Sequence, residues 1–190
     1  MKQVLSVILT LLSFLVKGQP LNQKVVRYST GEVKEIYPMR NNKINGWVQF
    51  YAKNGVKWKE FEVRENKPIG MVKRYNNEKE LIEMYEFDHE REMRQGRCVE
   101  FHEGKKKGEG NYRNGEKEGE WVEYYGETTE KCRYSNGEKN GPYRKFKKNK
   151  LIETGKHKDG CPNDTVKTFN ERGAIIRTMV WAKCHGYEIR

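Results

Sequence analysis

Apolar and polar residues alternate along most of the chain in short runs, which are separated by Gly and Asn. Residues 46–51 read GWVQFY and residues 59–63 read KEFEV. Alternation with a period of two predicts β-strands that turn one face toward a core. Asn-Gly and similar turns between the runs predict tight hairpins, because these residues adopt the positive backbone angles that such turns need. The pattern therefore predicts a β-meander.

A helical fold is the competing interpretation of the same apolar positions. The chain holds 18 Gly, most of them at turn positions a few residues apart. Inside a helix each would cost about 1 kcal/mol. Glycine spacing therefore favours strands over helices.

The strand pattern also repeats along the chain. Copies align on an anchor residue that stands five places before an aromatic residue, with spacings of 23, 24, 26, 23, 22 and 23 residues. The anchors are Gln23, Gly46, Gly70, Gly96, Gly119, Gly141 and Asp164. Such a period is the signature of a repeat architecture, in which each unit is stable only when stacked on its neighbours.

Two columns of the alignment are expected to form the repeat core. The apolar column stands two places after each anchor and holds Val25, Val48, Val72, Cys98, Trp121, Tyr143 and Val166. The aromatic column stands five places after each anchor and holds Tyr28, Tyr51, Tyr75, Phe101, Tyr124, Phe146 and Phe169. Positions three apart lie on opposite faces of a regular strand. Either both faces carry apolar cover, or the first strand of each unit bends.

About seven units of two strands each predict an all-β fold, an elongated antiparallel meander of fourteen strands. Before it, Lys2 precedes an apolar run over residues 4–16, and Lys17-Gly18-Gln19-Pro20 follows. This layout predicts a signal peptide over 1–18, cleaved after Gly18, and a repeat domain over 19–190. A buried N-terminal strand or helix is the alternative.

An apolar run of this length spans only about 20 Å as a helix, less than the ~30 Å of a bilayer core. We therefore expect no transmembrane segment in the mature chain. The protein is expected to be exported, and so periplasmic, associated with the cell envelope or secreted.

Composition adds a basic surface to this picture. Lys and Arg number 38 against 27 Asp and Glu, and 35% of the chain is apolar, which predicts a thin core. Aromatic residues at 12% argue against disorder. The basic clusters, candidates for binding an anion or a partner, are Lys105, Lys106, Lys107, Arg144, Lys145, Lys147, Lys148 and Lys150.

These basic clusters have two interpretations. They form a solubilising surface that blunts sheet edges, or an anion-binding surface in which basic and aromatic residues interleave. Export makes nucleic acid an unlikely partner and favours anionic lipid or polysaccharide.

The four cysteines are Cys98, Cys132, Cys161 and Cys184. Cys161 and Cys184 occupy equivalent places in neighbouring units, which we expect to lie two strands and ~9.5 Å apart, beyond the ~7 Å limit for a disulfide. If a disulfide forms, this pair is favoured because both residues lie near turns. Cys98 stands in the apolar column and is expected to act as a small hydrophobic residue.

Other chemistry has little support in the sequence. His157 and His185 lie near Cys161 and Cys184 and make a possible zinc set, but the spacing matches no established pattern. Solvated turn residues are the alternative, and we expect no metal and no cofactor. No nucleophile, base and orienting group recur together, so no catalytic residue and no enzyme activity are predicted. The strand glutamates, such as Glu60, Glu62 and Glu83, are interpreted as a solvent face.

Several segments share the motif G-x-W-x-x-Y-Y followed by N-G-x-K-x-G. The best matches are residues 119–126 with residues 136–141, then Gly46-Trp47 with Asn54-Gly55. The motif resembles the MORN repeats, in the bacterial variant found in YwqK-type antitoxins. Three features depart from it: Glu78 at a turn Gly, an insertion near residues 88–90, and Asp164 at an anchor.

This resemblance implies an elongated antiparallel sheet that binds proteins or lipids and has no chemistry of its own. It suggests a non-enzymatic, protein-binding module that is antitoxin-like or immunity-like, with a toxin as its partner. The alternative is an envelope-associated scaffold that binds anionic lipid or polysaccharide through a basic face.

Overall fold

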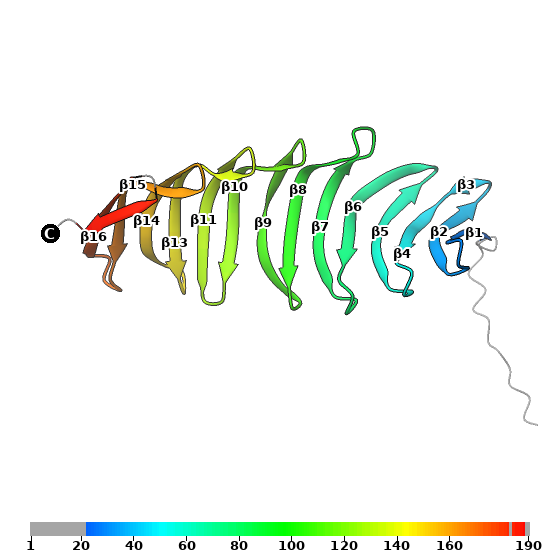
Figure 1. The fold of residues 1–190 in the computed structure, drawn as a ribbon, viewed down its shortest axis with the longest axis horizontal. Helices are drawn as coiled ribbons and strands as arrows, with labels where there is room; N and C mark the ends of the chain where they lie inside the picture. The colour runs from blue at the N-terminus through cyan, green and yellow to red at the C-terminus, as the bar shows by residue number, and fades with distance from the viewer. Residues whose placement is uncertain (1–21, 183, 189–190) are drawn as a thin grey trace, which may run out of the picture.

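The computed structural model describes residues 22–182 and 184–188, in which all regular structure is β. The predicted signal peptide lies outside the described residues. Seventeen strands form one antiparallel sheet, and Figure 1 shows them side by side in chain order. The prediction of an all-β antiparallel meander is confirmed. Within the described ranges, no helix has the length and apolar character needed to cross a bilayer.

Fourteen long strands form the seven predicted hairpins, and three short strands, β3, β12 and β17, are additional to them. The strands are β1 (Asn22–Arg27), β2 (Val33–Arg40), β3 (Lys43–Ile44), β4 (Gly46–Tyr51), β5 (Lys57–Arg64), β6 (Lys67–Tyr75), β7 (Leu81–Asp88), β8 (Met93–His102), β9 (Lys105–Arg113), β10 (Glu116–Tyr125), β11 (Thr128–Ser135), β12 (Glu138–Lys139), β13 (Gly141–Lys147), β14 (Lys150–Lys158), β15 (Cys161–Phe169), β16 (Ile175–Ala182) and β17 (His185–Glu188).

Every anchor residue except Gln23 forms a bend in the first strand of its hairpin. From Gly46 to Asp164 every anchor has a positive φ, for example 73° at Gly119 and 69° at Asp164. Glycine adopts this conformation without strain and Asp tolerates it. The pairing of β10 with β9 is interrupted between Glu118 and Val122, around the anchor Gly119. The upper ends of the strands consequently bend over, as Figure 1 shows.

The apolar column lies along one face of the sheet, here called the core face. Trp121 stands opposite Cys132, and Cys98 stands opposite Tyr85. Val25 differs from the other members and is 42% exposed. It stands opposite Ile36, which stands opposite Gln49, so it lies on the face away from the buried Val48. The buried members are Val48, Val72, Cys98, Trp121, Tyr143 and Val166.

The aromatic column lies on the other face, here called the back face. Tyr124 donates a hydrogen bond to Glu109 Oε1 at 2.7 Å, and Glu109 stands opposite Val122, which alternates with the buried Trp121. Both predicted arrangements occur. Apolar or aromatic residues cover both faces, and the first strands are also irregular, since the pairing shifts by one residue just before five of the aromatic residues. The column lies outside the buried core, contrary to expectation, and its half-buried members are Tyr28, Tyr51, Tyr75, Phe101, Tyr124, Phe146 and Phe169.

Trp121 is the centre of the core. Its ring is fully buried and makes edge contacts with Tyr112 and Tyr134, with ring centroids 5.6 and 5.7 Å away. Its Nε1 donates to the carbonyl oxygen of Asn111 at 3.1 Å. A Cβ at Gly110 would lie 2.3 Å from the ring, so this position must be glycine for the indole to lie flat on β9.

Candidate functional site

A row of buried and half-buried glutamates crosses the core face beside the apolar column. Glu83 stands opposite Glu100, and Glu123 stands opposite Glu130. Glu60 is buried as well, on the back face, where it stands opposite Lys73. The interpretation of the strand glutamates as a solvent face is therefore wrong for Glu60 and Glu83, and Glu62 is half-buried.

Cations from the upper ends of the strands neutralise these carboxylates. Each cation stands two residues before an anchor glycine, so the bend at the anchor carries its side chain over the core face. Lys117 Nζ lies over the Trp121 ring, 4.0 Å from its centre, and also contacts Glu100. The ion pairs are Arg94 with Glu83 at 2.9 Å, Lys117 with Glu100 at 3.0 Å, and Lys139 with Glu123 and Glu130 at 2.6 and 2.7 Å.

Tyrosine hydroxyls complete the polar row around Glu123. Tyr125 and Tyr134 each donate a hydrogen bond to this carboxylate at 2.6 Å. Burial by itself raises the pKa of Glu123, but the hydrogen bonds from Lys139 and the two tyrosines outweigh it and hold the pKa at about 2. The carboxylate is thus ionised and fully bonded, as a buried charge must be to be tolerated.

Two groups in this row have the composition of a metal site. The donor atoms of Glu123, Glu130 and Cys132 lie within 4.8 Å of one another, as do those of Glu83, Cys98 and Glu100. Burial raises the pKa of the Cys132 thiol to about 12, so it is a protonated, poor ligand. Lys139 and Arg94 already supply the positive charge, and the groups are explained as part of the fold.

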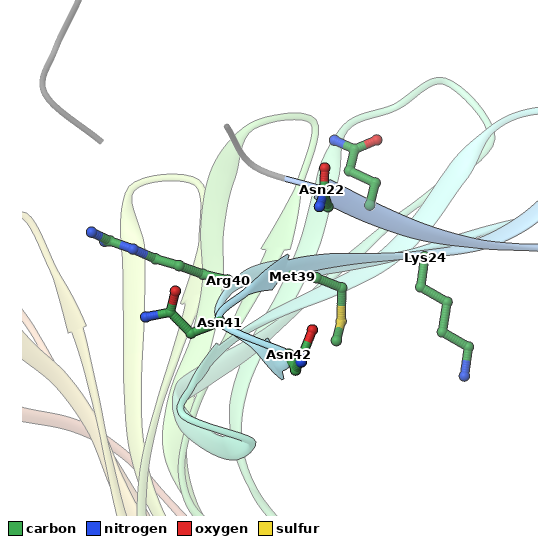
Figure 2. Close-up of a pocket in the computed structure, with 7 residues that line it drawn as sticks. Asn22, Lys24, Met39, Arg40, Asn41 and Asn42 are labelled. Atoms are coloured by element: carbon green, nitrogen blue, oxygen red, sulfur yellow. The ribbon is translucent and has the colours of Figure 1, made fainter. Parts of the chain in front are cut away.

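A hollow at the N-terminal end of the sheet lies between β1 and the turn that follows β2. It encloses about 550 Å³ and is lined mainly by amide side chains of Asn and Gln. In Figure 2, the side chains of Lys24 and Arg40 point in different directions. The polar groups do not converge on one point, so the hollow has no arrangement for recognising a specific ligand.

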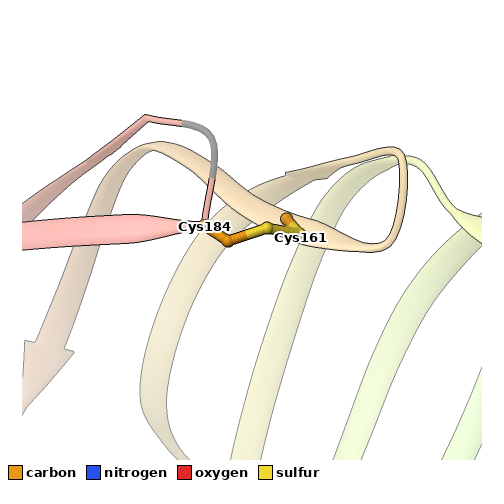
Figure 3. Close-up of a disulfide and its surroundings, with 2 residues drawn as sticks. All are labelled: Cys161 and Cys184. Atoms are coloured by element: carbon orange, nitrogen blue, oxygen red, sulfur yellow. A yellow bond between two sulfur atoms is a disulfide. The ribbon is translucent and has the colours of Figure 1, made fainter.

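Cys161 and Cys184 form a disulfide at the C-terminal end of the sheet, with their Cα atoms 5.2 Å apart (Figure 3). The expected separation of two strands is wrong. Asp164 stands opposite Trp181 in the β15–β16 hairpin. Cys161 lies three residues before Asp164, and Cys184 lies three residues after Trp181. Equivalent positions of consecutive units therefore meet across one hairpin at its open end.

We expect Cys161→Ser to destabilise the C-terminal hairpin by about 3 kcal/mol, the value for a covalent loop that closes over 23 residues. Amide hydrogen exchange should become faster in β16 and stay unchanged in β9, which lies several units away. Reductant should reproduce the effect in the wild type and add nothing in the variant. Equal protection of β16 in both proteins would contradict a stabilising role.

The disulfide also removes the possible zinc set, since neither sulfur is available as a thiolate. His157, another member of that set, packs on the Tyr143 ring with 4.4 Å between ring centroids. Burial lowers the pKa of His157, with smaller effects from nearby charges. This histidine is explained by packing.

The structure brings six of the eight residues of the predicted basic clusters to the lower edge of the sheet, where each long hairpin turns. Residues 105–107 follow the turn after β8, and Lys147, Lys148 and Lys150 flank the turn between β13 and β14. These six lysines, which we call the basic edge, are Lys105, Lys106, Lys107, Lys147, Lys148 and Lys150. About four strand spacings, or ~19 Å, separate the two groups.

Each lysine group lines a shallow groove together with aromatic side chains of the next hairpin. The first groove encloses about 340 Å³ and includes Tyr124 and Tyr125, the second of which is 53% exposed. The second encloses about 430 Å³ and includes Phe169. Lys106 pairs with Glu109 and Lys148 with Glu127, both at 3.1 Å. In the described part of the chain, the other four lysines have no ion pair.

Comparison with protein-family models finds no match, and neither does comparison with curated proteins.

The two remaining residues of the predicted basic clusters lie elsewhere. Lys145 is on the core face, where its Nζ lies 2.8 Å from Glu153 and 3.9 Å from Glu130. Arg144 projects from the back face, opposite Lys131. Strand alternation predicts this division, but the partners of Lys145 come from β11 and β14 and follow only from the pairing of the strands.

Proposed function

We propose that this chain is an exported, non-enzymatic scaffold of MORN-like repeats that attaches to an anionic membrane surface through its basic edge. The observation that carries the proposal is the gathering of six lysines from two distant sequence segments at one edge of the sheet. Hairpin tips along one edge of an elongated sheet can meet a flat surface together. The fold is a meander of sequential hairpins, and its assignment to the MORN repeats rests on the sequence motif.

The chemistry of the edge suits a lipid headgroup region. A lysine close to an anionic leaflet contributes about 1 kcal/mol, and the attraction falls off within a Debye length of ~8 Å at physiological ionic strength. Tyr125 donates its hydroxyl to Glu123 but is more than half exposed, so its ring adds an aromatic surface beside the lysines, and aromatic side chains of this type are enriched at membrane interfaces.

The disulfide supports the location of this function. Disulfides persist in oxidising compartments such as the periplasm and the cell exterior. The Cys161–Cys184 link therefore agrees with the export that the signal-peptide pattern predicts.

We expect replacement of Lys147, Lys148 and Lys150 with Ser to weaken binding to vesicles of anionic phospholipid about a hundredfold, because three cations are lost at ~1 kcal/mol each. The melting temperature should not fall, since all three side chains are exposed. Vesicle co-sedimentation at low and high salt measures the effect.

A matched control replaces three exposed lysines at the upper edge, Lys43, Lys67 and Lys158, and makes the same change in net charge. We expect it to bind nearly as the wild type does. Equal binding by all three proteins would show that the lysines serve solubility. That result would favour the protein-binding function implied by the MORN resemblance.

A further inference from the structure

A second cationic surface lies on the back face, away from the hairpin tips. Lys131 in β11 stands opposite Arg144 in β13, and Arg144 stands opposite Thr154 in β14. Thr154 in turn stands opposite Lys167 in β15. We call Lys131, Arg144 and Lys167 the cationic row, and all three side chains are exposed.

These three charges lack the partners that cations have on the core face. Within residues 22–182 and 184–188, no carboxylate forms an ion pair with any of them. Asp164 pairs with Lys156 at 3.4 Å, and Glu120 stands opposite Arg133. By contrast, Lys139 and Lys145 on the core face each contact two carboxylates.

Like charges that stand directly opposite in a sheet are destabilising, and the arrangement of Lys131 and Arg144 therefore has a cost in the free protein. The same cross-strand row carries acidic residues in the strands before β11, where Glu60 stands opposite Lys73 and Glu109 stands opposite Val122. The excess of positive charge is thus confined to β11–β15. A bound anion would remove the repulsion.

The surroundings of the row fit a chain of sugar rings. Lys131 Nζ lies 5.7 Å from the centre of the half-buried Phe146 ring, and Phe169 follows two residues after Lys167 on the same face. The row therefore has apolar rings along one side and the Thr154 hydroxyl group within it. Neighbouring strands are ~4.8 Å apart, so the cations repeat at about 5 and 10 Å across the strands.

We propose that the cationic row binds a linear acidic polysaccharide that lies across the strands of the back face. A polymer with acidic groups at regular intervals matches a row of cations that repeats across neighbouring strands. Single-stranded nucleic acid shares this charge pattern, but the disulfide indicates an oxidising compartment in which nucleic acid is an uncommon partner. The site uses none of the lysines of the basic edge and stands independently of the proposed membrane contact.

The test compares two triple variants of the full chain on dextran sulfate, with neutral dextran as the uncharged reference. Replacement of Lys131, Arg144 and Lys167 with Ser is expected to weaken binding to dextran sulfate about twentyfold, the effect of three exposed charge contacts. Its melting temperature should stay the same or rise, because the repulsion between Lys131 and Arg144 is removed. The Lys147, Lys148 and Lys150 variant of the basic edge carries the same charge change and is expected to retain binding.

The two surfaces give distinguishable results. Equal loss of dextran sulfate binding in both variants would show that the polymer responds to net charge alone, and would contradict the proposed site. So would unchanged binding in the cationic-row variant. If that variant instead loses binding to anionic vesicles and keeps dextran sulfate, the row is a lipid site and the polysaccharide proposal is wrong. Loss of vesicle binding in the basic-edge variant alone would leave the proposal for the row intact.

Discussion

Replacement of Lys139 with Ala is expected to lower the free energy of unfolding by about 4 kcal/mol, the scale for removing one partner of a buried ion pair. Lys139 bonds both Glu123 and Glu130, which stand directly opposite each other and are 8% and 4% exposed. Without the ammonium group two buried carboxylates repel each other, since Lys145 lies 3.9 Å from Glu130 and does not reach Glu123. Urea unfolding at neutral pH measures the loss.

The pH dependence identifies the cause of this loss. In the wild type the pKa of Glu123 is lowered to about 2 from its ordinary value of 4.5, so its contribution to stability is present above pH 4.5 and lost as the pH falls toward 2. In the Lys139→Ala variant the Glu123 carboxylate loses its strongest hydrogen-bond donor and gains a proton more readily. The difference between variant and wild type should therefore shrink in acid.

Two control variants complete the Lys139 experiment. Lys131→Ala in the neighbouring strand removes an exposed lysine and should change stability by less than ~0.5 kcal/mol. Lys139→Arg should retain most of the stability, because it keeps the charge. A loss of the same size for Lys131→Ala, or one independent of pH, would contradict the role assigned to Lys139.

Replacement of Trp121 with Ala is expected to cost about 4 kcal/mol, within the range for a buried aromatic side chain. The variant loses the contacts with Tyr112 and Tyr134 and leaves the Asn111 carbonyl without its indole partner. It also opens a cavity above Gly110, which has no side chain to fill it. Thermal and urea unfolding measure the effect.

Trp58→Ala is the matched control, because that indole is 39% exposed and belongs to the same kind of sheet. We expect a cost of less than half that at Trp121. Similar costs at the two positions would mean that Trp121 does not centre the core.

The repeat period and the turn residues were sufficient to predict the hairpins. Glycine anchors predicted where units begin, and the apolar column predicted which side of the first strand is buried in every unit except the one that begins at Gln23. The prediction of burial depends on the exact position relative to the anchor. Trp121, two places after its anchor, is fully buried, whereas Trp47, one place after its anchor, is 39% exposed. A shift of one residue changes the face of the strand.

The polar interior could not be predicted in this way. Glu83 and Glu123 alternate with apolar neighbours just as solvent-facing residues do, and their burial depends on cations that arrive from the bent upper end of a different strand. For the candidate site, the lysine runs were visible in the sequence. Their division between the basic edge, the core face and the back face depends on turn positions and cross-strand register, which place Lys131 and Lys167 beside Arg144 although neither belongs to a basic run.

The pairing of each strand with its neighbours in the chain has a consequence for how the protein is made. In the described residues each strand pairs with strands close to it in the chain, so β2 can pair with β1 as soon as β2 itself has emerged, and each later hairpin can add to an edge that is already formed. A chain delivered N-terminus first through a narrow pore can fold in the order in which it exits, with little apolar surface exposed at any time. The Cys161–Cys184 bond then fixes the β15–β16 hairpin, which pairs after the hairpins before it.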